Sequence, residues 1–348
     1  MGIFGHFVSQ STPDNPKHTE STIPACQGGS PLQGDAARVT RLAPSPTGAL
    51  HLGNARTFLI NWAMARMNGW RVVLRIEDLD TPRVKPETVS GTIDLLRWLG
   101  IDWDEGPIIQ SEDRQRHTAA MEALARGRFV FPSELTRKQI AEAASAPHDD
   151  DAVGSESRFT SEMRPEGIPK AFDDPSTSWR FITPDASVEF DDRFAGAQSI
   201  NPAQSVGDFV VWTKNGTPAY QLAVVVDDAA QGVTEIVRGD DLLDSTARQI
   251  LLQRALGIAP TPRYWHLPLV LGPDGRRLAK RHGDTRLDHY RAQGVPPGRI
   301  IGLLASWCGL AEREEVTAEE FARLFDLRKL ARTPIRLCQG DEAWLMQS

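Results

Sequence analysis

Cysteine is scarce in this sequence, with only Cys26, Cys308 and Cys338 among 348 residues. Their wide spacing gives neither a disulfide framework nor the closely paired cysteines of a structural zinc site. No apolar run approaches the roughly 20 residues that span a membrane, and residues 1–6 lack the basic start and long apolar core of a signal peptide. We therefore expect a cytoplasmic protein without a membrane span.

Basic residues are outnumbered as well, since 39 Lys and Arg stand against 46 Asp and Glu, for a net charge of −7. This balance argues against a protein that binds nucleic acid through its overall charge, although a local basic surface is compatible with it. The hydrophobic content of 40% and charged content of 24% are ordinary for a globular protein. A chain of this length can form one large domain with an insertion, or two domains.

A turn rich in proline and glycine occupies residues 41–54 (RLAPSPTGALHLGN). Its composition lets the backbone approach a ligand closely, and a helix that starts there offers unpaired N–H groups to phosphate oxygens. His51 is placed to donate to those oxygens as charge develops on them. The alternative is an ordinary turn without a ligand.

A basic loop lies far downstream, at residues 272–283 (GPDGRRLAKRHG). Residues 263–286 contain six Lys or Arg against two Asp, a local balance of +4 in an acidic chain. Such a concentration of positive charge indicates an anionic ligand that the loop brings close. The alternative is a solvated surface loop.

Alternating strand and helix patterns predict a parallel sheet with ligands at the carboxyl ends of its strands. In the first half we expect strands at 38–43 and 71–76 and helices at 51–67 and 86–99. In the second half the apolar run 219–226 predicts a buried parallel strand, followed by a helix at 242–256, the segment 265–271, and helical segments at 298–307 and 317–325.

Two regions lack this pattern. Residues 1–36 are rich in Ser, Thr, Pro, Gly and Gln, and we expect a disordered tail. From about 131 to 201 the periodicity breaks down, and 148–151 and the stretch up to 178 have the composition of loops. We interpret 131–201 as an insertion between the halves of a nucleotide-binding fold.

Both motifs are similar to those of a known family. Residues 41–54 resemble the HIGH motif of class I aminoacyl-tRNA synthetases, in the form typical of glutamyl enzymes, with Asn54 replacing the last histidine. Residues 272–283 resemble the KMSKS loop, with Arg277 for the first lysine, Ala279 for the serine, and Lys280 for the lysine that contacts the triphosphate. Residues 75–83, 220–228 and 237–242 extend the likeness, which covers about 38–310 in the family's order.

The resemblance implies an α/β fold: a Rossmann-like class I synthetase catalytic domain at 37–275 with the insertion, then the KMSKS loop and a small C-terminal helical region at 276–348. Only 68 residues (348 minus 280) follow Lys280, which is too few for another domain of about 100 residues. We therefore expect no anticodon-binding domain. The short form resembles the glutamyl-queuosine tRNA(Asp) synthetase family.

Members of that family are ligases that activate L-glutamate with ATP and attach it to the queuosine base of tRNA-Asp. The implied partners are ATP, L-glutamate and queuosine-containing tRNA-Asp, and we expect a monomer. Two alternatives stay open. One is a truncated glutamyl-tRNA synthetase that charges tRNA-Glu, and the other is an inactive RNA-binding paralogue.

The resemblance also assigns site residues. His51 and Lys280 are the implied catalytic groups. The residues implied for L-glutamate are Arg41, Ala43, Ser45, Glu77, Tyr220 and Arg238. Those implied for ATP are Pro44, His51, Gly53, Asn54, Asp241 and Lys280.

Arginine forks suit the carboxylates of glutamate, and a carboxylate such as Glu77 suits its ammonium group. Each role has a structural alternative. Glu77 would only cap a strand end, Tyr220 would belong to the core, or Arg238 would pair with Asp240 or Asp241.

Two expectations concern metals. Mg²⁺ should accompany ATP, held mainly by phosphates and water. Family members often carry a Cys-x-Cys zinc motif in the insertion, but Ser133 and Leu135 occupy the matching positions here. We therefore predict no structural zinc.

Overall fold

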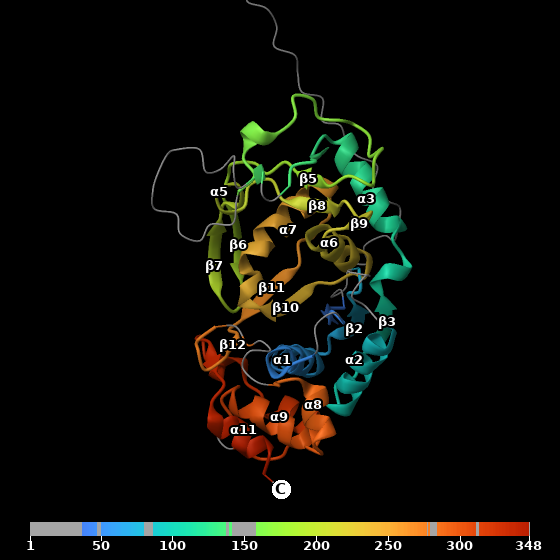
Figure 1. The fold of residues 1–348 in the computed structure, drawn as a ribbon. Helices are drawn as coiled ribbons and strands as arrows, with labels where there is room; N and C mark the ends of the chain where they lie inside the picture. The colour runs from blue at the N-terminus through green and yellow to red at the C-terminus, as the bar shows by residue number, and fades with distance from the viewer. Residues whose placement is uncertain are drawn as a thin grey trace, which may run out of the picture. The chain divides into compact units, whose positions relative to one another are not determined.

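The computed structural model describes residues 37–46, 50–79, 86–136, 139–140, 158–276, 278, 284–310 and 313–347. The tail at 1–36, the acidic stretch at 148–151 and Lys280 lie outside the described residues, so the predictions made for them stay predictions. Figure 1 shows the chain with its helices and strands labelled.

The central feature is a seven-stranded sheet with the order β3-β2-β1-β10-β11-β6-β7. All neighbouring strands run parallel except β6 and β7. Its members are β1 (Val39–Leu42), β2 (Arg71–Ile76), β3 (Glu105–Ile109), β6 (Val188–Asp192), β7 (Gly196–Ile200), β10 (Glu235–Gly239) and β11 (Arg263–Leu267). The predicted parallel sheet is confirmed.

The strand order places the first strand between two halves of the sheet. β1 pairs with β2 on one side, with Val39 opposite Arg71, and with β10 on the other, with Thr40 opposite Glu235. In sheets of this kind a crevice opens beyond the carboxyl ends of the strands where the order reverses. The ends of β1 and β10 therefore define the place for a ligand.

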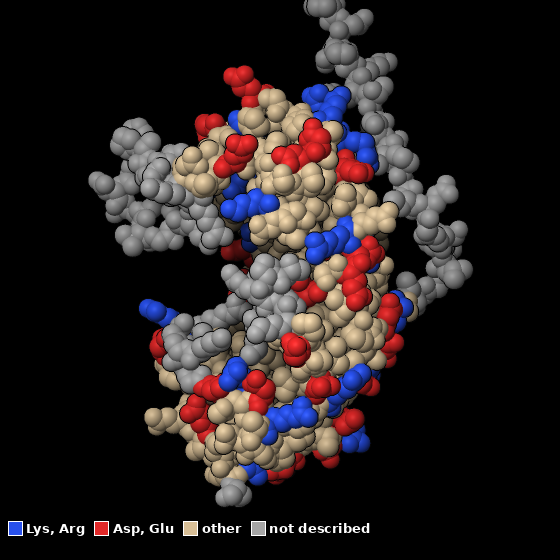
Figure 2. Space-filling model, turned by 45° about the vertical axis from the view of Figure 1, so that its right-hand side comes forward, with Lys and Arg blue, Asp and Glu red and all other residues tan. Residues whose placement is uncertain are grey.

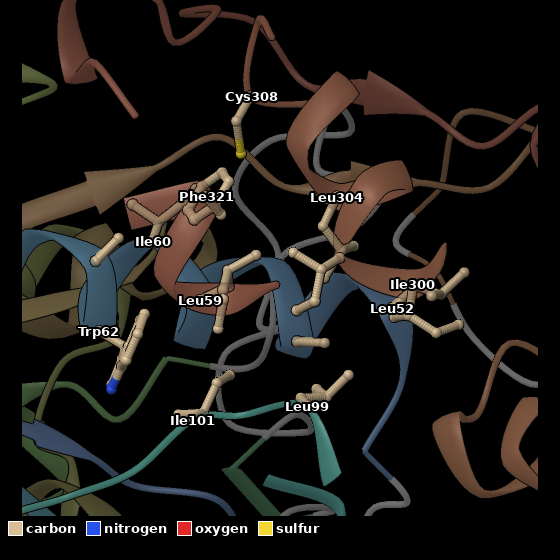
Figure 3. Packing of buried hydrophobic residues seen from close by; sticks show 14 of the residues in the cluster. Leu52, Leu59, Ile60, Trp62, Leu99, Ile101, Ile300, Leu304, Cys308 and Phe321 are labelled. Atoms are coloured by element: carbon tan, nitrogen blue, oxygen red, sulfur yellow. The ribbon is translucent and has the colours of Figure 1, made fainter. Parts of the chain in front are cut away.

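Helix α1 (Leu52–Asn68) connects β1 to β2 and confirms the predicted helix. It ends at Gly69, whose φ of 64° is a left-handed conformation that glycine adopts without strain. Figure 3 shows its residues Leu52, Leu59 and Ile60 in one apolar cluster with side chains of the C-terminal helices. That packing fixes the start of α1, which faces the crevice, on a rigid support.

The C-terminal helices form the other side of this cluster. Ile300 and Leu304 come from α9, and Phe321 from α10. The predicted helical segments at 298–307 and 317–325 are therefore confirmed. The C-terminal elements are α8 (Leu287–Ala292), α9 (Pro297–Ser306), α10 (Ala318–Leu324), η6 (Leu327–Lys329), α11 (Gln339–Leu345) and a two-stranded sheet of β12 (Val270–Leu271) and β13 (Ile335–Arg336).

The predicted strand at 219–226 is wrong, because this segment begins helix α6 (Tyr220–Ala230). Every residue from Gln221 to Asp228 is buried. A helix that is covered on all sides shows no apolar stripe, so its sequence cannot be told from a buried strand by periodicity. Contacts with α3 (Gln115–Arg126) and α7 (Leu243–Leu256) override the strand preference of three consecutive valines.

Strands that the sequence did not predict lie within 131–201, the region interpreted as an insertion, and just beyond it. A four-stranded antiparallel sheet joins β4 (Val130–Pro132), β5 (Trp179–Phe181), β8 (Val210–Thr213) and β9 (Thr217–Pro218). Strands β6 and β7 instead extend the central sheet, because Asp192 of β6 pairs with Tyr264 of β11. The end of the predicted insertion is thus continuous with the central sheet.

The other elements agree with the sequence where it made a prediction. Helix α2 (Pro86–Trp98) and helix α7 match the predictions at 86–99 and 242–256. Short elements complete the description: η2 (Gln110–Glu112), η3 (Ser161–Met163), α5 (Pro202–Ser205) and η4 (Asp240–Leu242).

Charged side chains of both signs are interspersed over the described part of the face in Figure 2. In the part of the chain that the structure describes, none of the helices combines the length and apolarity needed to cross a bilayer.

Candidate functional site

A cavity of about 520 Å³ opens at the carboxyl ends of β1, β2 and β10. All predicted site residues within the described ranges line it: Arg41, Ala43, Pro44, Ser45, His51, Gly53, Asn54, Glu77, Tyr220, Arg238 and Asp241. A second cavity, of about 700 Å³, lies beside the antiparallel sheet and is lined by none of them. These residues come from five separate stretches of the chain, so it is the fold, and not their proximity in the sequence, that brings them to one cavity.

His51 shapes the entrance to α1. Its Nδ1 atom accepts hydrogen bonds from the backbone N–H groups of Gly53 (3.1 Å) and Asn54 (3.3 Å). In a neutral imidazole the proton therefore sits on Nε2, which makes that atom a donor. A Cβ atom at Gly53 would lie 3.1 Å from Cε1 of His51, so glycine leaves the ring its room.

The ends of the basic loop are held beside the same cavity by backbone hydrogen bonds, both before and after residues 279–283. Before it, Leu278 N–H donates to the carbonyl of Val270, a cavity residue, at 3.3 Å. After it, Leu52 N–H donates to Thr285 O (3.1 Å) and Leu287 N–H donates to Leu50 O (2.9 Å). Both ends of the loop that carries Lys280 therefore adjoin the turn at His51.

A chain of alternating charges lies under one side of the cavity. Arg75, which is fully buried, donates to Asp228 (2.7 Å) and to Glu77 (3.0 Å). Asp228 is also paired with Nε of Arg41 at 3.4 Å. Each arginine and carboxylate thus fixes the next, and Arg41 and Glu77 are held in place at the cavity wall.

The surroundings of Glu77 disfavour its ionised form. Burial raises the pKa of Glu77 above its ordinary value, against the lowering effect of Arg75 and Arg41. A folded-state pKa above the unfolded value means that the folded chain binds the proton more tightly, so stability falls as pH rises from about 4.5 through the folded pKa. Ionising this carboxylate inside the fold therefore lowers stability, and perturbed pKa values of this kind are concentrated at functional sites.

Arg238 has a different set of partners. Its Nε donates to Nε2 of His266 (3.0 Å) and its Nη2 donates to Oγ1 of Thr246 (2.7 Å). The predicted alternative, pairing with Asp240 or Asp241, is not the arrangement found. The remaining nitrogen, Nη1, is buried and has no hydrogen-bond partner among the described residues. A buried guanidinium nitrogen without an acceptor at a cavity wall is suited to an anionic ligand.

Tyr220 lies at the first position of α6 and is 42% exposed. The alternative that it belongs to the core is therefore wrong. Its hydroxyl and the side chain of Ser45 add polar groups to a cavity that also contains Phe58, Leu242 and Leu269. The site combines charged recognition groups with an apolar wall, which is typical of small-molecule sites.

Sequence reasoning missed several residues that support the site. Arg75 and Asp228 stood inside the quoted motifs, and a charged residue in a strand or helix that is otherwise apolar was an available signal. His266 is a polar residue within the strand Arg263–Leu267 and gave a weaker signal. Asp192 gave none, because it lies 74 residues from its partner His266.

Metal binding finds little support in the described ranges, which contain no group of three or more His, Cys, Asp or Glu able to hold an ion. The absence of structural zinc stays a prediction. The carboxylates of Glu77 and Asp228 already pair with arginines, so Mg²⁺ would rely on the phosphates of its nucleotide and on water.

Comparison with known proteins identifies the family of this chain. Residues 38–339 match the family model described as tRNA synthetases class I (E and Q), catalytic domain. A glutamyl-Q tRNA(Asp) synthetase of Symbiobacterium thermophilum is 47% identical over 85% of this chain and 95% of its own length. A glutamate–tRNA ligase of Nitrosomonas europaea is 37% identical over 88% of this chain, but over only 66% of its own length.

A solved structure is similar as well. The glutamate tRNA ligase of Elizabethkingia meningosepticum, crystallised with its amino acid, superposes with a TM-score of 0.72 at 28% identity. The match covers 89% of this chain and 69% of that protein.

Proposed function

We propose that this chain, which belongs to the class I tRNA synthetases of the E and Q group, activates L-glutamate with ATP and transfers the glutamyl group to the queuosine base of tRNA-Asp. The observation that carries the proposal is the convergence of Arg41, Glu77, Arg238 and His51 on one cavity. The acceptor is inferred from the relative that matches along nearly its whole length.

Activation is an in-line attack of the glutamate α-carboxylate oxygen on the α-phosphorus of ATP. The new O–P bond forms as the bond to the pyrophosphate leaving group breaks, so the protein needs no nucleophile of its own. Catalysis then consists of alignment and of stabilising the charge on the phosphates. Mg²⁺ bound to ATP would neutralise part of that charge.

Glutamate would be held by groups of opposite charge. Arg238 Nη1 and the guanidinium of Arg41 face the carboxylates, and ionised Glu77 faces the ammonium group. The backbone at Ala43 and the hydroxyls of Ser45 and Tyr220 supply neutral hydrogen bonds. Because both arginines are fixed by buried partners, little side-chain freedom is lost on binding.

ATP would lie across the turn that ends β1. Pro44, Gly53 and Asn54 provide close backbone contact at the start of α1, and Asp241 suits the ribose hydroxyls. His51 Nε2 donates to the phosphates. Lys280 would reach the β- and γ-phosphates from the loop, whose ends are anchored beside His51.

Transfer to a tRNA distinguishes the candidate functions. The enzyme, ATP, Mg²⁺ and radiolabelled glutamate would be incubated with tRNA-Asp that contains queuosine, tRNA-Asp that lacks it, and tRNA-Glu. We expect label only on the first, and ribonuclease cleavage should place it in the anticodon fragment rather than the 3′ fragment.

Other outcomes identify the alternatives. Label at the 3′ end of tRNA-Glu would show a truncated glutamyl-tRNA synthetase. The similarity to the glutamate–tRNA ligase of Nitrosomonas europaea is what keeps this alternative open. No label on any tRNA, together with no glutamate-dependent exchange of pyrophosphate into ATP, would show an inactive paralogue.

A further inference from the structure

Three side chains on adjacent strands form a buried relay behind Arg238. Asp192 ends β6, His266 lies on β11, and Arg238 lies on β10. Oδ2 of Asp192 is 2.6 Å from Nδ1 of His266, and Nε2 of His266 is 3.0 Å from Nε of Arg238. Exposure of the three residues is 2%, 1% and 4%, so the relay is buried.

The hydrogen-bond directions in the relay are determined by its two ends. A carboxylate can only accept a hydrogen bond, so Nδ1 of His266 carries a proton and its N–H donates a hydrogen bond to Asp192. Guanidinium nitrogens can only donate, so Nε2 of His266 must be an acceptor for Arg238. Burial and the charges of Arg238 and Arg41 lower the pKa of His266, against the opposing effect of Asp192. The ring therefore stays neutral in the one tautomer that fits.

His266 and Thr246 together hold two of the three guanidinium nitrogens of Arg238, a residue that lines the cavity. With Nε bound to His266 and Nη2 bound to Thr246, the planar fork cannot turn, and Nη1 is left as the nitrogen without a described partner. A different tautomer of His266 would place an N–H against Nε–H of Arg238 and force the guanidinium to move.

We propose that Asp192 and His266 are positioning residues for glutamate recognition, which set the orientation of Arg238 through the tautomer of His266. The inference rests on the proposed function, because it takes glutamate as the ligand of Arg238. It also gives a role to β6, a strand from the region in which the sequence showed no site.

The substitution Asp192→Asn tests the tautomer directly. Oδ1 of Asp192 accepts from the backbone N–H groups of Phe194 (2.9 Å) and Ala195 (2.6 Å). The amide oxygen of an asparagine must take that position, which turns its NH₂ group toward Nδ1 of His266. His266 must then accept at Nδ1 and carry its proton on Nε2, facing Arg238.

We expect Asp192→Asn to raise the KM for glutamate in pyrophosphate exchange by about tenfold or more, the scale on which outer-shell partners act at metal sites. The KM for ATP should stay within about twofold. ¹⁵N chemical shifts of His266 should show the proton on Nδ1 in the natural protein and on Nε2 in the variant. A selective rise in the KM for glutamate that accompanies this switch is a result that a merely structural role would not produce.

Two variants of His266 keep the test informative if Asp192→Asn does not fold. His266→Gln can place an amide oxygen where Nε2 lies and should retain a glutamate KM close to the natural value. His266→Leu fills similar space without an acceptor and should raise it. The control is Asp208→Asn, which alters a carboxylate that is 1% exposed and paired with Arg164 at the other cavity, beside the antiparallel sheet. It should affect stability but not the KM for glutamate.

The outcomes separate this inference from the proposed function. If the natural enzyme exchanges pyrophosphate with glutamate, but Asp192→Asn and His266→Leu behave like Asp208→Asn, the positioning role is wrong and the function stands. If the natural enzyme shows no glutamate-dependent exchange, the function itself fails and the inference falls with it.

Discussion

Replacing Arg238 with alanine is expected to reduce glutamate-dependent exchange of pyrophosphate into ATP by more than tenfold. Arg238 lines the cavity, and its Nη1 is a buried nitrogen without a partner among the described residues. Truncating one partner of a buried charge pair, here the proposed pair with a glutamate carboxylate, costs about 2–5 kcal/mol. At about 1.4 kcal/mol per factor of ten, that is a loss of roughly 30-fold to several thousand-fold in kcat/KM for glutamate. Steady-state exchange with varied glutamate measures it.

A matched control is Arg254→Ala, which removes an exposed arginine of α7 that does not line this cavity. It should exchange pyrophosphate at the natural rate. Arg238→Lys should also be severely impaired, because an ammonium group cannot bond His266, Thr246 and a ligand in the geometry of a planar fork. If Arg238→Ala exchanged pyrophosphate at the natural rate, Arg238 would have no role in binding glutamate.

The second large effect is expected for His51→Asn. The amide oxygen of asparagine, a favoured N-cap residue, can accept from Gly53 and Asn54 as Nδ1 of His51 does. The variant keeps the start of α1 but loses the donor at Nε2. Removal of one such donor to developing charge costs about 10²- to 10³-fold in kcat, and thermal unfolding should be nearly unchanged.

His51→Ala separates the two roles of this residue. It loses the donor and the cap together, so its kcat should fall as far as that of His51→Asn, while its stability falls by about 1 kcal/mol. Natural exchange rates in His51→Asn would show that the ring only caps the helix.

The sequence predicted those parts of the site that are local in the chain. β1 ends at Leu42 and α1 begins at Leu52, and proline, glycine and periodicity in the sequence between Arg41 and Asn54 gave local signals for a strand end and a helix start. Glu77 follows the predicted strand 71–76, which the structure reproduces as Arg71–Ile76. Parallel pairing of β1 and β2 then brings these two strand ends together.

Contacts between distant residues were beyond sequence reasoning. Helix α6 was mistaken for a strand because burial on all sides removes the periodicity that distinguishes the two. The contact of Asp192 with His266 depends on the pairing of β6 with β11. No local sequence pattern predicts that pairing. The predicted site therefore contained the groups that line the cavity and omitted several buried residues that contact them.

We propose that ATP lies between the turn at His51 and the loop that carries Lys280. The most direct test of this proposal is a crystal structure with ATP, Mg²⁺ and the unreactive alcohol analogue of glutamate. We predict Nε2 of His51 and Nζ of Lys280 within hydrogen-bonding distance, about 3 Å, of the triphosphate, and the amino-acid analogue against Arg238 and Glu77. A triphosphate bound elsewhere, or bound here with Lys280 turned away from it, would contradict the account.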